Sequence, residues 1–329
     1  MKSVALVTIG CKLNQFETEQ MRESLEGLGY RIANQRDVAD IYIINTCTVT
    51  SKSDYRSRQA IRRALRANPD ALIIATGCYA QRFPDAIAKI EGVDVIIGNA
   101  EKQNIAKYVH IPKQSKPLVR VRRPDEDEFQ NLGRCIARFG SYTRAFVKIQ
   151  DGCDYRCSYC AVPLARGRSR SKKPDLIERE VRLLVEHGYK EIVLTGVHLG
   201  SYGKDLEPPT RLTNLLETLS PIDGLIRIRL SSIEPTDFSD DLIDLIGDPS
   251  AKICPHVHIP LQSGDNRILR RMGRLYTREQ YKDLIARISE QVPMCGIGAD
   301  VMVGFPGEDE HAFKNTYDLI QALPITYLH

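Results

Sequence analysis

Short apolar runs alternate with amphipathic stretches along the first third of this 329-residue chain. The apolar runs predict strands over residues 4–9, 41–45, 71–76 and 93–97. The stretches that follow them repeat apolar residues at helical spacing and predict helices over 15–28, 53–67, 84–90 and 101–109. Uniformly apolar strands that alternate with helices are typical of a parallel sheet covered on both faces. The pattern therefore predicts an amino-terminal doubly wound parallel α/β domain over residues 1–110.

The same alternation returns from residue 141. Strands are predicted over 145–150, 191–195, 226–230, 257–260 and 298–303, with a last one beginning at 325. Helices are predicted over 174–187, 212–219, 240–246, 267–272 continuing into 277–291, and 310–322. Five β/α units and the start of a sixth predict a partial (β/α)6-type barrel over 141–329, truncated in its sixth strand.

Residues 111–140 separate the two patterns. They contain Pro112, Pro117 and Pro124 and an acidic run, and they show little periodicity, which is typical of a linker. Cys135 stands there without a partner at a metal-binding spacing, so we interpret it as a spare thiol.

Composition narrows the class of protein further. The formal net charge is +4, so affinity for nucleic acid would come from local basic patches. The apolar run at the start is too short for a signal peptide, and no run approaches the ~20 residues that cross a bilayer. Nine cysteines suggest no even disulfide framework. We expect a cytoplasmic protein in a reducing compartment, with no membrane partner.

Three thiols follow the first predicted strand of the second domain. Cys153, Cys157 and Cys160 have the spacing C-x3-C-x2-C. Three thiolates can bind three irons of a 4Fe–4S cluster and leave the fourth iron open for another ligand. A zinc knuckle is the alternative, but it needs a fourth ligand, and none lies close in the sequence.

Three more thiols occupy equivalent positions in the first domain. Cys11, Cys47 and Cys78 each come just after a predicted strand. Ligand-binding residues of open α/β sheets gather at the carboxyl ends of the strands, so the three can meet at one edge. Any one of them alone could be a buried structural thiol. Together they predict a second cluster with three cysteine ligands.

The spacing of the second-domain thiols, with Tyr159 before the last one, resembles the signature of the radical S-adenosylmethionine (SAM) superfamily. With the segments 10–19 (GCKLNQFETE), 45–50 (NTCTVT), 77–81 (GCYAQ) and 150–171, almost the whole chain resembles the radical SAM methylthiotransferases. The resemblance implies two 4Fe–4S clusters and S-adenosyl-L-methionine as cofactors. One cluster would cleave SAM to a 5′-deoxyadenosyl radical. The other would hold the sulfur, methylated by a second SAM.

The resemblance also points to residues near SAM. Radical SAM cores place SAM across the carboxyl ends of the barrel strands, and Tyr159 would lie near the adenine. The loops after the other strands supply further candidate contacts, which are Thr195, Ser232, Glu234, Gln262 and Val303.

Basic residues gather in three places. Arg58, Arg62 and Arg66 share one face of a predicted helix, which we interpret either as a solvated surface or as a phosphate-binding face. A second basic stretch, from 166 to 173, follows the cysteine loop and includes Arg166, Arg168 and Arg170. The third comprises Arg267, Arg270, Arg271 and Arg274. Such patches suit an RNA backbone.

A third metal site is not expected. Cys254, His256 and His258 alternate along one predicted strand, but neighbouring prolines and the lack of a carboxylate partner argue against a site. His198 is interpreted as structural.

Within the family, the segments 10–19 and 45–64 most resemble members that act on tRNA carrying N6-threonylcarbamoyladenosine, at C2 of that adenine. The expected partners are a tRNA anticodon stem-loop and an electron donor such as flavodoxin or ferredoxin. Isopentenyladenosine in tRNA and a ribosomal-protein aspartate are alternative substrates. A zinc-containing RNA-binding protein without catalysis is the alternative of another class. The small carboxy-terminal RNA-binding domain of family members is absent from this sequence.

Overall fold

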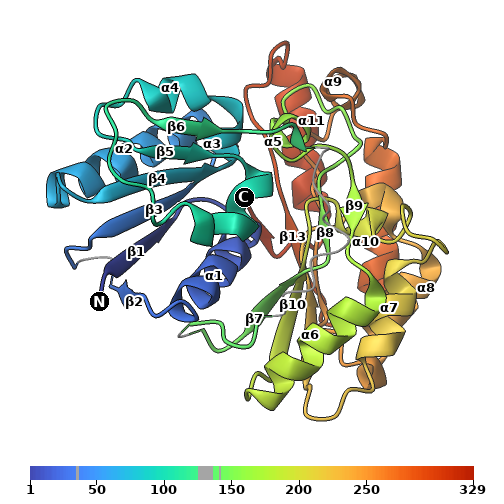
Figure 1. Cartoon of the computed structure of the whole chain (residues 1–329). Helices are drawn as coiled ribbons and strands as arrows, with labels where there is room; N and C mark the ends of the chain where they lie inside the picture. The colour runs from blue at the N-terminus through green and yellow to red at the C-terminus, as the bar shows by residue number, and fades with distance from the viewer. Residues whose placement is uncertain (35–36, 125–135, 141) are drawn as a thin grey trace. The chain divides into compact units, whose positions relative to one another are not determined.

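A computed structural model describes residues 1–34, 37–124, 136–140 and 142–329 (Figure 1). The described residues form two compact units. The first comprises those of 1–124, 138–140 and 161–168, and the second comprises those of 136–137, 142–160 and 169–329. Cys135 and the acidic run 125–128 lie outside the described residues.

The first unit is built on a six-stranded parallel sheet with the strand order β2-β1-β3-β4-β5-β6. Its strands are β1 (Ser3–Thr8), β2 (Arg31–Ala33), β3 (Ile41–Thr46), β4 (Leu72–Gly77), β5 (Val95–Ile97) and β6 (Leu118–Arg120). The pattern did not predict β2 or β6. The short strand β6 lies within the expected linker and pairs in parallel with β5. Three residues that include Arg120 carry too little apolar pattern to be recognised.

Helices cover both faces of this sheet. They are α1 (Lys12–Glu26), α2 (Ser51–Ala67), α3 (Cys78–Arg82), α4 (Pro84–Ala88) and a 3₁₀ segment, η1 (Asn99–Lys107). Ile61 of α2 packs in one core with Ile44 and Ile73, whereas Met21 of α1 packs in the other with Ile43. Successive strand residues face opposite cores, which confirms the doubly wound arrangement. The predicted helix over 101–109 is a 3₁₀ segment instead.

The second unit contains two three-stranded parallel sheets. One has the order β11-β10-β7 and the other β12-β13-β14. The strands are β7 (Ala145–Lys148), β10 (Glu191–Thr195), β11 (Arg227–Leu230), β12 (His256–His258), β13 (Gly296–Ala299) and β14 (Tyr327–Leu328). A parallel bridge between Ile228 and Ile253 links the two sheets. Six parallel strands with helices between them form the predicted partial barrel.

Between these strands lie helices α6 (Pro174–Glu186), α7 (Leu212–Leu219), α8 (Asp240–Gly247), α9 (Asn266–Met272), α10 (Arg278–Gln291) and α11 (Glu310–Ala322). Helices α9 and α10 are separate, because Gly273 adopts a left-handed conformation and Thr277 caps the start of α10. No helix among the described residues is long and apolar enough to cross a membrane.

Three short elements that flank the cysteine loop in the sequence were not predicted as such. Strands β8 (Gln150–Asp151) and β9 (Arg170–Ser171) form a short antiparallel pair. Helix α5 (Val162–Arg166) begins two residues after Cys160 and belongs to the first unit.

Candidate functional site

The loop that carries Cys153, Cys157 and Cys160 begins where β8 ends. Gln150 fixes this start, because its Nε2 atom donates to the carbonyl oxygens of Asp151 (3.0 Å) and Gly152 (2.7 Å). Gly152 has a φ of 72°, a left-handed conformation that favours glycine. The chain therefore turns sharply before the first thiol.

All three thiols of this loop are half-buried. The amide of Cys160 donates to the carbonyl of Cys157 (3.0 Å), and the amide of Tyr155 donates to the sulfur of Cys153 (3.4 Å). Ser158 fixes the loop to the end of α9, because its amide donates to the carbonyl of Met272 (2.9 Å). The donor set is three thiols on one short loop, which fits a 4Fe–4S cluster with one open iron.

His198 lies beside the first of these thiols. Its Nδ1 atom is 3.7 Å from the sulfur of Cys153, and its Nε2 atom is 2.6 Å from a carboxylate oxygen of Asp237. Burial opposes protonation of the ring, but hydrogen bonds with Asp237 and Cys153 prevail and raise the pKa of His198 to about 9. The interpretation of His198 as merely structural was incomplete, since no local pattern places a histidine 45 residues from its partner.

Arg274 lies beside the second thiol. Its Nη1 atom is 3.4 Å from the sulfur of Cys157 and 3.4 Å from the hydroxyl oxygen of Tyr159. Its Nη2 atom forms an ion pair with Glu234. Burial raises the pKa of Glu234 above its usual range, although the Arg274 charge opposes that rise. The assignment of Arg274 to a basic surface patch is wrong, because the residue is only 8% exposed.

The remaining predicted SAM contacts lie at or just after the carboxyl ends of barrel strands. Thr195 ends β10 and is buried. Ser232 follows β11, and its hydroxyl oxygen is 2.7 Å from Nδ1 of His258. Gln262 has a φ of 64° after β12, and Val303 follows β13 with 64% of its surface exposed. The structure joins Tyr159 to Glu234 through Arg274, whereas Val303 lies open to solvent.

The first-domain thiols also gather at the carboxyl ends of strands. Cys11 is exposed before α1, and Cys47 and Cys78 are buried after β3 and β4. A Cβ atom on Gly10 would lie 2.9 Å from the sulfur of Cys47, so the loop that bears Cys11 passes directly over Cys47. Burial raises the pKa of the Cys47 thiol, and the neighbouring Cys78 and Cys11 thiols raise it further. Three thiols in one place match the soft ligands that iron–sulfur clusters prefer.

Side chains from α1 and α2 position the loops that carry these thiols. Asn14 of α1 donates to the carbonyl oxygens of Ile9 (2.7 Å) and Thr46 (3.0 Å). Ser57 of α2 donates to the carbonyl of Cys47 (3.0 Å) and accepts from its amide (3.2 Å). Hydrogen bonds from α1 and α2 therefore hold the backbone just after β1 and at the end of β3, next to Cys11 and Cys47.

A buried ion group lies near the same thiols. Glu17 of α1 accepts from Nη1 of Arg166 (2.8 Å) and pairs with the ammonium group of Lys102. Burial lowers the pKa of Lys102, and the Cys78 thiol is among the groups that oppose this change. Arg166 was predicted to bind RNA, but it is 2% exposed and its charge is taken by Glu17, so this prediction is wrong.

The other basic residues fall into two groups. Arg62, Arg66 and Arg168 are exposed, and the first two line an open pocket of about 350 Å³. Arg58 is half-buried, donates to the hydroxyl of Tyr79 (2.8 Å) and lies over that ring. Arg170 is half-buried in β9.

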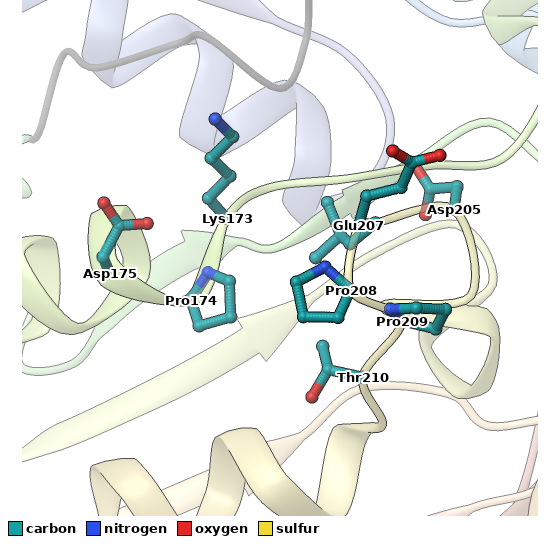
Figure 2. Close-up of a pocket in the computed structure, with 9 residues that line it drawn as sticks. Lys173, Pro174, Asp175, Asp205, Glu207, Pro208, Pro209 and Thr210 are labelled. Carbon is teal, nitrogen blue, oxygen red and sulfur yellow. The ribbon is translucent and has the colours of Figure 1, made fainter.

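A separate pocket of about 710 Å³ lies beside the start of α6 (Figure 2). It is lined by Lys173, Pro174, Asp175, Asp205, Leu206, Glu207, Pro208, Pro209 and Thr210. Three carboxylates against one ammonium group do not suit a phosphate. None of the predicted site residues lines this pocket.

The partial barrel and its three-thiol loop define a radical SAM protein, and residues 147–320 match the Radical SAM superfamily. Residues 3–98 match the uncharacterized protein family UPF0004. The structure is similar to a solved structure of the radical SAM methyltransferase TsrM from Kitasatospora setae, with a TM-score of 0.70 and 18% sequence identity. The match covers 100% of this chain and 72% of the TsrM chain, and it shows the fold.

Curated relatives narrow the class further. The chain is 41% identical to the threonylcarbamoyladenosine tRNA methylthiotransferase MtaB of Bacillus subtilis, covering 100% of the chain and 73% of the relative. It is 42% identical to the MtaB of Aquifex aeolicus, over 99% of the chain and 79% of the relative. It is 37% identical to a tRNA-2-methylthio-N(6)-dimethylallyladenosine synthase of Clostridium botulinum, covering 95% and 70%. The chain belongs to the radical SAM methylthiotransferase family.

Proposed function

We propose that this enzyme methylthiolates tRNA at C2 of N6-threonylcarbamoyladenosine next to the anticodon. The observation that carries the proposal is the 41% and 42% identity to two MtaB enzymes along essentially the whole chain. The two sets of three thiols would supply the cluster ligands that such chemistry needs.

The second-domain site would generate the radical. Cys153, Cys157 and Cys160 would bind a 4Fe–4S cluster, and when bound with SAM it supplies a 5′-deoxyadenosyl radical on one-electron reduction. His198 and Arg274 would position two of these sulfurs, since His198 makes a polar contact with Cys153 and Arg274 makes one with Cys157. Tyr159, Thr195, Ser232, Glu234, Gln262 and Val303 are the proposed SAM-binding residues. The electron would come from a donor such as flavodoxin or ferredoxin.

The first-domain thiols would hold the auxiliary 4Fe–4S cluster that carries the sulfur. Cys47 and Cys78 are buried, whereas Cys11 is exposed, so one side of the group is open to an exogenous ligand. Burial raises the pKa of the Cys47 thiol, and the neighbouring Cys78 and Cys11 thiols add to this rise, which supports a shared metal site.

The tRNA would contact the exposed basic residues. Arg62 and Arg66 of α2 and Arg168 offer guanidinium groups to phosphates. Arg58 is tied to Tyr79, so its contribution would be smaller. Arg170 is kept as a weaker candidate because it is half-buried.

The second candidate substrate is dimethylallyladenosine in tRNA, because relatives with that activity in their names are 36–38% identical to the chain. Mass spectrometry of tRNA nucleosides from a strain that lacks the gene distinguishes the two. We expect loss of the methylthio group from threonylcarbamoyladenosine alone, and its return with the wild-type gene but not with a Cys153→Ala variant. Loss from the dimethylallyl nucleoside alone would contradict the proposed substrate.

A further inference from the structure

Two histidines and one aspartate gather at the carboxyl ends of three neighbouring parallel strands. His258 ends β12, Asp300 directly follows β13, and His329 directly follows β14. Each residue offers one potential ligand atom, a histidine nitrogen or a carboxylate oxygen. These three atoms all lie within 4.8 Å of one another. Carboxyl ends of barrel strands are where enzymes of this architecture bind ligands.

The spacing of the three groups suits a metal ion. Asp300 Oδ1 is 3.4 Å from Nε2 of His258 and 3.3 Å from Nδ1 of His329. Two ligand atoms that bind a tetrahedral ion at about 2.1 Å lie roughly 3.4 Å apart. The carboxylate oxygen therefore lies as far from each imidazole nitrogen as two ligands of one metal ion lie from each other.

His258 is oriented in the way that metal-binding histidines are. Its Nδ1 atom is hydrogen-bonded to Ser232 (2.7 Å), so Nε2 points to the other side of the ring. Nε2 is buried and makes no hydrogen bond among the described residues, and its neighbour at 3.4 Å is Oδ1 of Asp300, the carboxylate of the same group. An imidazole held through one nitrogen, with the other left for an ion, is the usual outer-sphere arrangement of a metal site.

The backbone fixes the other two residues. The amide of His329 donates to the carbonyl of Ala299 (2.9 Å), and the amide of Val301 donates to the carbonyl of His329 (2.8 Å). The carbonyl of Asp300 accepts from the amide of Gln262 (2.8 Å). Since these bonds hold the ends of the strands together, the three side chains are brought together by the sheet itself.

We propose that His258, Asp300 and His329 bind a divalent transition-metal ion, Zn²⁺ or Fe²⁺, separately from both cysteine sets. Two imidazoles and one carboxylate are a ligand set that these ions accept. Three protein ligands leave at least one coordination position for water or for an oxygen or nitrogen atom of a bound molecule. This inference does not depend on the proposed substrate.

This site differs from the group of Cys254, His256 and His258, which the sequence pattern suggested as a metal site but which we did not expect to bind a metal ion. His256 is not part of it, because its Nε2 atom is hydrogen-bonded to the hydroxyl of Tyr327 (2.9 Å). The missing carboxylate is Asp300, which comes from the next strand along the sheet and not from the strand of His258.

Manganese(II) is a suitable probe, because it binds imidazole and carboxylate ligands and has a strong electron paramagnetic resonance signal. The full chain, with both cysteine sets loaded with oxidised 4Fe–4S clusters, would be titrated with Mn²⁺ in the absence of tRNA. We expect about one bound Mn²⁺ per chain by the ligand count, nitrogen modulation from imidazole in pulsed spectra, and displacement of the ion by Zn²⁺.

Variants make the test specific. His329→Ala changes an exposed side chain and should weaken Mn²⁺ binding at least about tenfold, as should His258→Gln, which should also reduce the nitrogen modulation. The matched control, His311→Ala, removes an exposed histidine of α11 and should bind as the wild type does. A visible absorption spectrum of the 4Fe–4S clusters equal to that of the wild type would show that each variant is folded. Equal Mn²⁺ affinity in wild type and His329→Ala, or bound Mn²⁺ without nitrogen modulation, would overturn the proposal.

Discussion

His198 and Cys153 are joined by a contact of 3.7 Å between Nδ1 and Sγ, while Nε2 of the same ring is 2.6 Å from Asp237. The carboxylate therefore orients an imidazole toward a proposed cluster ligand. An N–H donor to a cluster sulfur stabilises the reduced, more negative state.

The first prediction concerns this contact. Replacing His198 with Leu should lower the reduction potential of the cluster on Cys153, Cys157 and Cys160. Loss of one hydrogen bond to a charged group costs about 1.5–3 kcal/mol, and 1.4 kcal/mol corresponds to about 59 mV for one electron. We therefore expect a decrease of about 60–130 mV in a redox titration followed by electron paramagnetic resonance. An unchanged potential in a variant with full iron content would show that the contact does not tune the cluster.

The second prediction concerns the two cysteine sets. The reconstituted protein should contain about eight irons per chain, by the stoichiometry of two 4Fe–4S clusters. Changing Cys11, Cys47 and Cys78 to Ala should halve the iron, preserve reductive formation of 5′-deoxyadenosine and abolish methylthio transfer. Changing Cys153, Cys157 and Cys160 should abolish 5′-deoxyadenosine formation. Methylthiolated product from the first variant would refute the assignment of the auxiliary cluster.

The third prediction concerns α2. Changing Arg62 and Arg66 to Ala removes two exposed charges, so tRNA binding should weaken and its dependence on salt should flatten by about one to two units of slope. Filter binding at several salt concentrations measures both effects. Arg179→Ala in α6, another exposed arginine, is the matched control and should bind as the wild type does. If the double variant keeps the slope of the wild type, this helix face is only solvated surface.

The fourth prediction concerns the buried ion group. Arg166→Met removes the guanidinium group that pairs with Glu17 and donates to the side-chain amide oxygen of Asn14, so the free energy of unfolding of the first unit should fall by about 3–5 kcal/mol. Arg168→Ala, two residues away and exposed, should change it by less than about 0.5 kcal/mol. Urea unfolding followed by circular dichroism would compare the two. A loss of stability in Arg168→Ala as large as in Arg166→Met would contradict a special role for the buried pair.

The sequence alone determined the features that depend on local pattern. Apolar strands that alternate with helices predicted both α/β domains, because the period of apolar residues follows the secondary structure. It also predicted where Cys11, Cys47 and Cys78 meet, because each follows a strand and parallel strands end at a common edge. The C-x3-C-x2-C loop needed no tertiary information either, since its ligands lie within eight residues.

Only the tertiary structure decided which charged side chains are buried and what they touch. Arg166 and Arg168 look alike in the sequence, yet the first meets Glu17 across 149 residues and the second is exposed. Arg274 reaches Cys157 across 117 residues in the same way. A charge is stable inside a protein only with a partner. That partner is supplied by the packing of distant elements, which no local spacing records.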